Sequence, residues 1–249
     1  MINDQERKKY NNILEYNGQA LADRFVLNCS SFKRNGYFLE LGSREPKTTN
    51  NSYILEKEFG WKGFLVEKDR THESSYRTIR PNSVPIIKDA TQIDYKSLFK
   101  QNNFPNNLDF WQLDLEVRDN TALKTLIKIN DEILGEYKFA TVTMEHDIYT
   151  GFQTAVETRT KSREILQDRG YYCVFSDILD APDVCPLHLS DRMLKYGCVD
   201  YPYEDWWVHP DLVNMEYIKH LQTKNKNKYM KINTKIGIID CFKTYEMEY

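Results

Sequence analysis

The chain has 249 residues, of which 41% are hydrophobic and 29% are charged, a composition typical of a folded globular protein rather than a disordered or fibrous one. Lys and Arg number 34 against 37 Asp and Glu, so the net charge of −3 provides no overall positive field to attract nucleic acid or an anionic membrane. The longest apolar runs are far shorter than the roughly 20 residues that span a bilayer, and the first residues are polar where a secretory signal would be apolar. We therefore expect a cytoplasmic protein with no nucleic-acid partner and no insertion into a membrane.

Helix-forming residues dominate residues 4–32, where apolar side chains recur at helical spacing and predict one or two N-terminal helices. From Gly36 the pattern changes to short apolar runs separated by amphipathic segments. The runs predict strands at 37–41, 64–66, 84–87, 108–113 and 139–144, with helices at 51–59, 70–79, 95–101, 120–130 and 154–168. Because parallel strands need helical crossovers of this kind, the alternation predicts a doubly wound α/β domain.

The last third of the chain adds two predicted strands, at 171–175 and 205–208. The proline-containing stretch between them is predicted to be a functional loop, and the lysine-rich residues 219–235 a solvated helix end and turn. No linker divides the chain. We therefore expect a single domain, with an N-terminal helical cap (1–35), an α/β core (36–210) and a C-terminal extension (211–249).

The turn after the first strand is the first candidate binding feature, because open α/β sheets bind ligands beyond the carboxyl ends of their strands. A dinucleotide site needs three spaced glycines there, and this turn has only Gly42, followed by Ser43. Two carboxylates, Glu40 and Glu45, flank the turn. They would repel a pyrophosphate and attract a ligand that carries an ammonium and a sulfonium group. The turn therefore favours S-adenosylmethionine over a nicotinamide dinucleotide.

Acidic residues also follow the second and third predicted strands. Glu67 stands where nucleotide-binding α/β folds place the acid that holds ribose hydroxyls. Asp89 could meet an adenine amino group, and the small Ala90 leaves room for the ring. Lys68 could anchor the carboxylate of the cofactor or a phosphate of the acceptor, although an exposed salt bridge is the commoner fate of such a residue.

Three segments near the start of the core, 36–42 (GYFLELG), 51–56 (NSYILE) and 60–67 (GWKGFLVE), resemble in order and spacing the opening of FkbM-like S-adenosylmethionine-dependent methyltransferases. Residues 108–116 (LDFWQLDLE) resemble the fourth-strand motif of that family, although Val117 stands where the family usually has glycine. Residues 143–147, 169–171 and 204–209 match later landmarks. The likeness thus spans about residues 36–210.

The resemblance implies a Rossmann-like class I methyltransferase fold, with strand order 3-2-1-4-5-7-6 and only the last strand antiparallel. It also implies methylation of a hydroxyl group, commonly of a sugar. A further likeness, to glycan methyltransferase domains of large algal viruses, implies a deoxysugar acceptor such as rhamnose and, for a viral protein, the cytoplasm of the host cell. On this resemblance the expected cofactor contacts are Glu40, Gly42, Ser43, Asn51, Glu67, Lys68, Asp89, Ala90 and Asp114.

Catalysis is expected at the ends of the fourth and fifth strands, where a base must remove the hydroxyl proton during an in-line displacement. Asp114 and Glu116 share one face of their strand, as do Glu145 and Asp147 on the next strand. His146, whose ordinary pKa lies near neutrality, is the predicted base and Asp114 is its rival. Glu116 and Glu145 complete the predicted catalytic group.

Two other interpretations of these strand ends stay open. Asp114, Glu116 and Asp147 could hold Mg²⁺ or Ca²⁺ through oxygen ligands, which would orient the hydroxyl and lower its pKa. Alternatively, the acids are simply solvated and His146 is bonded to a backbone carbonyl. For the whole chain, a nicotinamide-dependent oxidoreductase and a catalytically inactive glycan-binding module are the competing functions.

An aromatic cluster follows the predicted loop and includes Trp206 and Trp207. It suits either sugar stacking or a hydrophobic core. If strand alternation holds, Trp206 and Val208 face one way and Trp207 the other, so that at most one tryptophan faces an acceptor.

Overall fold

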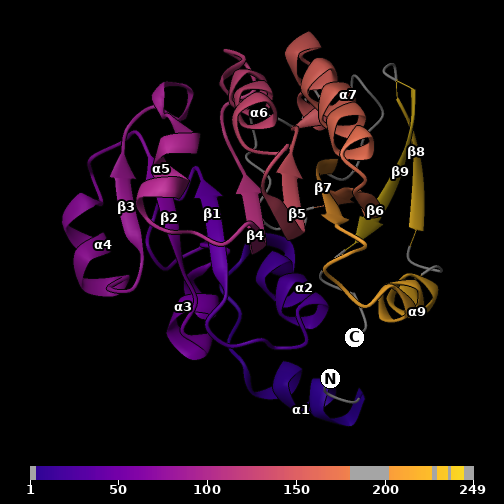
Figure 1. Cartoon of the computed structure of the whole chain (residues 1–249). Helices are drawn as coiled ribbons and strands as arrows, with labels where there is room; N and C mark the ends of the chain where they lie inside the picture. The colour runs from indigo at the N-terminus through magenta and orange to yellow at the C-terminus, as the bar shows by residue number, and fades with distance from the viewer. Residues whose placement is uncertain (1–3, 180–201, 226–228, 235–236, 244–249) are drawn as a thin grey trace.

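The computed structural model describes residues 4–179, 202–225, 229–234 and 237–243 (Figure 1). Within these ranges the chain forms a nine-stranded sheet in the order β3-β2-β1-β4-β5-β7-β6-β9-β8. The first seven strands therefore have the predicted order 3-2-1-4-5-7-6, and β7 is antiparallel to both of its neighbours, as expected. This confirms the predicted fold class, to which β9 and β8 add an extension beside β6.

All seven predicted strands are present, most of them longer than predicted. The strands are β1 (Tyr37–Leu41), β2 (Lys62–Glu67), β3 (Val84–Ile87), β4 (Asn107–Leu113), β5 (Lys138–Glu145), β6 (Tyr172–Leu179), β7 (Pro202–Val208), β8 (Tyr229–Thr234) and β9 (Gly237–Lys243). Strands β6 and β7 extend into the stretch predicted to be a loop, and the rest of that stretch, 180–201, lies outside the described residues. Strand β3, which contains Pro85, lies at one end of the strand order.

Helices flank the sheet on both sides. They are α1 (Asp4–Ile13), α2 (Ala22–Cys29), α3 (Tyr53–Phe59), α4 (Glu73–Ile79), α5 (Tyr95–Gln101), α6 (Thr121–Glu132), α7 (Gln153–Asp168) and α9 (Met215–Asn225). The short 3₁₀ helices are η1 (Gln19–Leu21), η2 (Ala90–Gln92) and η3 (Ile148–Thr150). The lysine-rich segment predicted to be a helix end and turn contains the end of α9 and the whole of β8. In the described part of the chain, every helix is too short or too polar to cross a bilayer.

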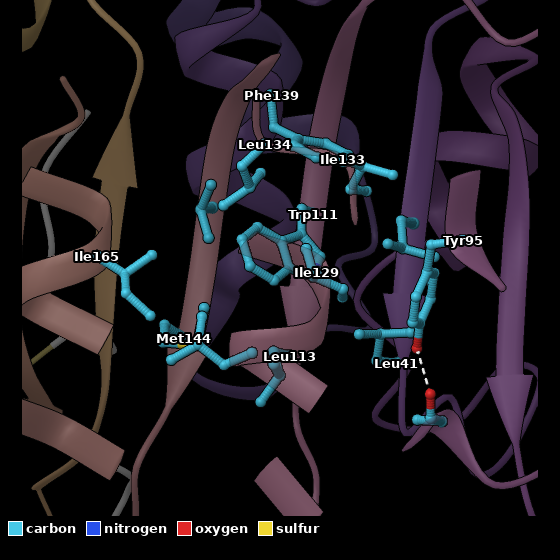
Figure 2. Packing of buried hydrophobic residues seen from close by; sticks show 14 of the residues in the cluster. Leu41, Tyr95, Trp111, Leu113, Ile129, Ile133, Leu134, Phe139, Met144 and Ile165 are labelled. Atoms are coloured by element: carbon cyan, nitrogen blue, oxygen red, sulfur yellow. Dashed lines mark hydrogen bonds between the residues drawn. The ribbon is translucent and has the colours of Figure 1, made fainter. Parts of the chain in front are cut away.

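Helices α5, α6 and α7 cover one face of the sheet, where alternate strand residues form the first hydrophobic cluster (Figure 2). Trp111 and Leu113 of β4 and Met144 of β5 pack there with Ile129 of α6. Burial of such side chains contributes on the order of 25 cal/mol per Å² of apolar surface, and it fixes the faces of the strands. Residues one position away in β4 and β5 must therefore face the opposite side.

The second cluster lies on the opposite face, beneath α2, α3 and α9. Trp206 stacks on Phe25 of α2 with ring centroids 4.7 Å apart, and Val208 belongs to the same cluster. Trp207 instead packs in the first cluster, which confirms the predicted alternation. Since both tryptophans are fully buried, they belong to the core, and the sugar-stacking interpretation does not apply to them.

Candidate active site

A cavity of about 780 Å³ lies at the carboxyl ends of β1, β2, β3 and β4. This volume falls within the roughly 300–1,000 Å³ that small-molecule pockets usually occupy. The strand order reverses between β1 and β4, and ligands of open α/β sheets bind at such a switch point. Six of the predicted cofactor contacts line the cavity, namely Gly42, Glu67, Lys68, Asp89, Ala90 and Asp114.

Gly42 allows the turn after β1 to approach the end of β4 closely. Its φ angle is +81°, and a Cβ atom there would lie 1.7 Å from the carbonyl oxygen of Asp114. Hydrogen bonds on both sides hold this arrangement: Gly42 N donates to the carbonyl of Val66, and Asp114 N donates to the carbonyl of Leu41. No side chain fits at this position, so the backbone itself forms part of the cavity wall.

Polar contacts fix the two acids on the β2 and β3 side of the cavity. The Glu67 carboxylate accepts hydrogen bonds from the backbone N–H groups of Arg44, at 3.0 Å, and Asp69, at 2.8 Å. Asp89 accepts hydrogen bonds from the Thr91 hydroxyl and N–H groups, which hold the pKa of Asp89 below its usual value. Both side chains are therefore held in place by backbone N–H groups at the cavity edge.

The cavity lining is predominantly acidic. It contains six acidic side chains (Glu67, Asp69, Asp89, Asp114, Glu116, Asp119) and four basic ones (Arg44, Lys68, His72, Lys88). A cleft in which one sign of charge predominates attracts ligands of the opposite sign. The electrostatics thus favour a cationic ligand and disfavour a pyrophosphate.

Three predicted cofactor contacts do not line the cavity but support the turn beside it. Glu40 is 1% exposed and accepts hydrogen bonds from Asn51 N and from the Ser52 hydroxyl. The Ser43 hydroxyl lies 2.7 Å from the Tyr76 hydroxyl. Glu40 faces the α2 and α3 side of the sheet, because its neighbours in β1 fill the opposite core.

Asp114, Glu145 and Asp147 come together at the ends of β4 and β5, as their spacing predicts. The Glu145 carboxyl group forms hydrogen bonds with both aspartates. Burial, followed by the negative charges of the two aspartates, raises the pKa of Glu145 well above its usual value. Because two ionised carboxylates cannot hydrogen-bond to each other, at least one member of this carboxyl cluster carries a proton.

Burial also raises the pKa of Asp114, and it raises the pKa of Asp147 to about 7. Asp114 is the member of the carboxyl cluster that lines the cavity. Glu116 also lines the cavity but is exposed, and its carboxylate accepts a hydrogen bond from Arg118 N at 2.9 Å. The predicted four-acid group is thus a half-buried cluster of three carboxyl groups, with the exposed Glu116 at the rim.

His146 lies apart from the cavity, on the side of the sheet covered by α7. Its imidazole is fully buried, and Nδ1 accepts a hydrogen bond from Ile148 N at 3.2 Å. Because Nδ1 is placed as an acceptor, the ring hydrogen belongs on Nε2, which lies 3.4 Å from Asp205 and 3.5 Å from Asp177. Within the residues that the structure describes, Nε2 has no hydrogen-bond partner but is buried, and His146 does not line the cavity, which is at odds with the base role predicted for it.

His146, Asp177 and Asp205 are spaced closely enough to suggest a metal site. However, Arg163 forms two hydrogen bonds with Asp205, at 2.7 and 2.8 Å, and Arg159 forms two with Asp177, at 2.8 and 2.6 Å. Burial opposes ionisation, but the charge of Arg163 holds the pKa of Asp205 far below its usual value. The donor set is that of a buried ion-pair network, which the sequence alone gave no reason to expect.

No family model and no curated protein matches the chain. Among solved structures, the chain is similar to a putative rRNA methylase from Clostridium thermocellum, with 9% identity and a TM-score of 0.44 over 79% of this chain and 98% of that one. It is also similar to a TehB-like SAM-dependent methyltransferase from Corynebacterium glutamicum, with 8% identity and a TM-score of 0.44 over 83% of this chain and 100% of that one. A third similar structure is a Burkholderia thailandensis N1-methyltransferase with bound S-adenosylhomocysteine, with 10% identity and a TM-score of 0.42 over 76% of each chain. Similarity at this level identifies neither an activity nor a substrate.

Proposed function

We propose that this chain is an S-adenosylmethionine-dependent O-methyltransferase that methylates a sugar hydroxyl of a glycan, with a deoxysugar such as rhamnose as the first acceptor to test. The observation that carries the proposal is the acidic cavity at the switch point of the sheet. A cofactor with a sulfonium and an ammonium group suits this lining, whereas the pyrophosphate of a nicotinamide dinucleotide does not.

The side chains around the cavity fit the parts of such a cofactor. Glu67 offers carboxylate oxygens to ribose hydroxyls, and Asp89 can accept a hydrogen bond from an adenine amino group. Ala90 leaves space for the ring, and the bare backbone at Gly42 admits the amino-acid end. When bound, the cofactor supplies an electrophilic methyl group on a positively charged sulfur.

Asp114 is the proposed base, in place of His146. It is the acid that both lines the cavity and belongs to the carboxyl cluster. A raised pKa makes a carboxylate a stronger base, which suits it to take the proton of an acceptor hydroxyl as the methyl group is transferred. Through their shared hydrogen bond, Glu145 orients the Asp114 side chain.

A hard cation remains the alternative for Asp114, Asp147 and Glu116, although among the described residues only His146, Asp177 and Asp205 have ligand atoms spaced closely enough for one ion. In that case the cation would lower the pKa of the acceptor hydroxyl. The test therefore includes the metal.

The first experiment is titration of the protein with S-adenosylhomocysteine in EDTA and again in Mg²⁺, with NADH as the control ligand. Micromolar binding of S-adenosylhomocysteine alone is the expected result. Binding of NADH instead, or of neither ligand, would overturn the assignment of the cofactor. A requirement for Mg²⁺ would assign the carboxyl cluster to a metal.

The second experiment measures methyl transfer from radiolabelled S-adenosylmethionine to rhamnose-containing oligosaccharides. Asp114→Asn should abolish turnover and keep S-adenosylhomocysteine affinity, whereas Asp119→Asn, on the same cavity wall, should keep most of the turnover. Unchanged turnover in Asp114→Asn would refute its role as the base. Cofactor binding without transfer to any sugar would refute the proposed acceptor and favour the inactive glycan-binding module.

A further inference from the structure

The turn between β1 and α3 is strained. Arg44 has a φ angle of +41° and Thr49 one of +54°, a region that side-chain-bearing residues seldom adopt. Such conformations persist only where surrounding contacts fix them, and they are common at functional sites. The start of this turn, at Gly42 and Arg44, lines the candidate cofactor cavity.

Arg80, the residue after α4, forms hydrogen bonds with this turn. Its side chain is fully buried, and Nε donates to the Glu56 carboxylate of α3 at 2.8 Å. One terminal nitrogen donates to the Pro46 carbonyl at 3.2 Å and to the Asn50 side chain at 2.7 Å, and the other donates to the Ser52 hydroxyl at 2.6 Å. All three guanidinium nitrogens thus donate hydrogen bonds, which connect Pro46 and Asn50 of the turn to the start of α3.

Tyr76, one turn earlier in α4, holds the other end of the turn. Its hydroxyl donates to the Arg44 carbonyl at 2.6 Å and lies 2.7 Å from the Ser43 hydroxyl. The Asn50 amide completes the arrangement by donating to the Ser43 carbonyl at 3.0 Å. Contacts from α4 therefore reach the backbone on which the shape of the cavity wall depends.

Arg80 also supplies the positive charge between two buried acids, Glu40 and Glu56. Burial raises the pKa of Glu40, and the charge of Arg80 opposes that rise. The Ser52 hydroxyl links the two side chains, because it receives a hydrogen bond from Arg80 and donates one to Glu40. Lysine could keep the charge but not the fork of donors that joins these groups.

We propose that Arg80 is a positioning residue for the cofactor site: its guanidinium group holds the β1–α3 turn in the shape that binds S-adenosylmethionine, without itself touching the cofactor. Arg80 is not among the residues that line the cavity. This inference rests on the proposed function, because it concerns the affinity of that same site.

Arg80→Lys tests the proposal, with Arg77→Lys, on the exposed side of α4, as its matched control. Leu221→Ala, in the core beneath α9 at the far end of the sheet (Figure 1), is a control for general destabilisation. Titration with S-adenosylhomocysteine, well below the melting temperature of each variant, should show affinity at least about tenfold weaker for Arg80→Lys, since the turn is no longer pre-organised. Amide hydrogen exchange at residues 42–44 should accelerate in the same variant, and both controls should keep the original affinity.

Tyr76→Phe provides a milder variant in case Arg80→Lys does not fold. It removes only the hydroxyl contacts with Ser43 and Arg44, and the expected result is a smaller loss of affinity with faster exchange at the same amides. Unchanged affinity in Arg80→Lys, or an equal loss in Leu221→Ala, would overturn the positioning role while leaving the proposed function intact. If the unaltered chain does not bind S-adenosylhomocysteine, the proposed function fails and this inference fails with it.

Discussion

Replacement of Gly42 by alanine tests the close approach of the β1 turn to the end of β4. A Cβ atom at Gly42 would lie 1.7 Å from the Asp114 carbonyl oxygen, whereas ordinary contact begins at 3.4 Å. Gly170 provides a matched control, because its φ angle of +83° is close to the +81° of Gly42 and nothing lies within 4 Å of a Cβ built there. The two alanine variants therefore share the backbone cost and differ in the steric clash.

The expected magnitudes follow from this comparison. The left-handed conformation costs an alanine about 1–2 kcal/mol at either position. At Gly42 the clash with the backbone adds about 1–3 kcal/mol of overpacking. It also strains the hydrogen bond from Asp114 N to the Leu41 carbonyl, which is worth about 1 kcal/mol. We expect Gly170→Ala to lose about 1–2 kcal/mol of unfolding free energy and Gly42→Ala about 3–6 kcal/mol.

Urea denaturation of both variants measures these losses, and titration with S-adenosylhomocysteine measures the effect on the site. Gly42→Ala should lose most of its affinity, because the clash must displace Gly42 or Asp114, both of which line the cavity, while Gly170→Ala should keep its affinity. Equal losses of stability in the two variants would refute the close contact between the β1 turn and Asp114.

Three further predictions concern buried groups and the cavity. Burial raises the pKa of Asp23 from 3.8 to about 6, so the folded state binds the proton more tightly and stability falls as the pH rises through that interval. Between pH 4 and pH 7, urea denaturation should show the natural chain losing up to about 3 kcal/mol more stability than Asp23→Asn. Parallel pH profiles of the two proteins would contradict this. Arg163→Met leaves the buried Asp205 without its main counter-charge and should lower the free energy of unfolding by about 3–5 kcal/mol in urea denaturation. Lys161→Met, on the exposed side of α7, should lower it by less than about 1 kcal/mol. Similar losses in the two variants would argue against a buried network. Ala90→Phe should fill the cavity and abolish S-adenosylhomocysteine binding with an unchanged circular dichroism spectrum, and full retention of affinity would place the ligand elsewhere.

The strands could be predicted because their signal is local. Runs such as 37–41 and 84–87 are short, apolar and bounded by polar segments, and the observed β1 and β3 have these same limits. The strand predicted at 171–175 stops short of the charged residue Asp177. In the structure Asp177 stays buried at a φ angle of +54° because Arg159 and Arg163 neutralise it, and the strand continues to Leu179. Those arginines are close to Asp177 in space but not in sequence.

The difference between signals that are local in the sequence and contacts that form only in the fold also explains which parts of the candidate site could be predicted. Gly42, Glu67, Asp89 and Asp114 could be placed at one cavity because the carboxyl ends of parallel strands meet at one edge of the sheet. The support for the turn could not be predicted, since the partners of Arg80 become known only once α3 and α4 are packed.

His146 shows the limit of pattern arguments most clearly. Alternation separates it from Glu145 and Asp147, but the pattern did not say which face held the ligand site. Its hydrogen bond with Ile148 N and its approach to Asp205 depend on η3 and β7, whose packing against the end of β5 no local sequence pattern specifies.

The proline in β3 bears on how the protein behaves when it is concentrated. Among the described strands β3 pairs only with β2, so one of its sides is an edge that could recruit a strand from another molecule. Pro85 has no N–H group and interrupts the row of donors that such an added strand would need. The exposed Val84 therefore lies on an edge that resists strand-by-strand association, and we expect molecules of this protein to associate in crystals or concentrated solution through surfaces other than the β3 edge.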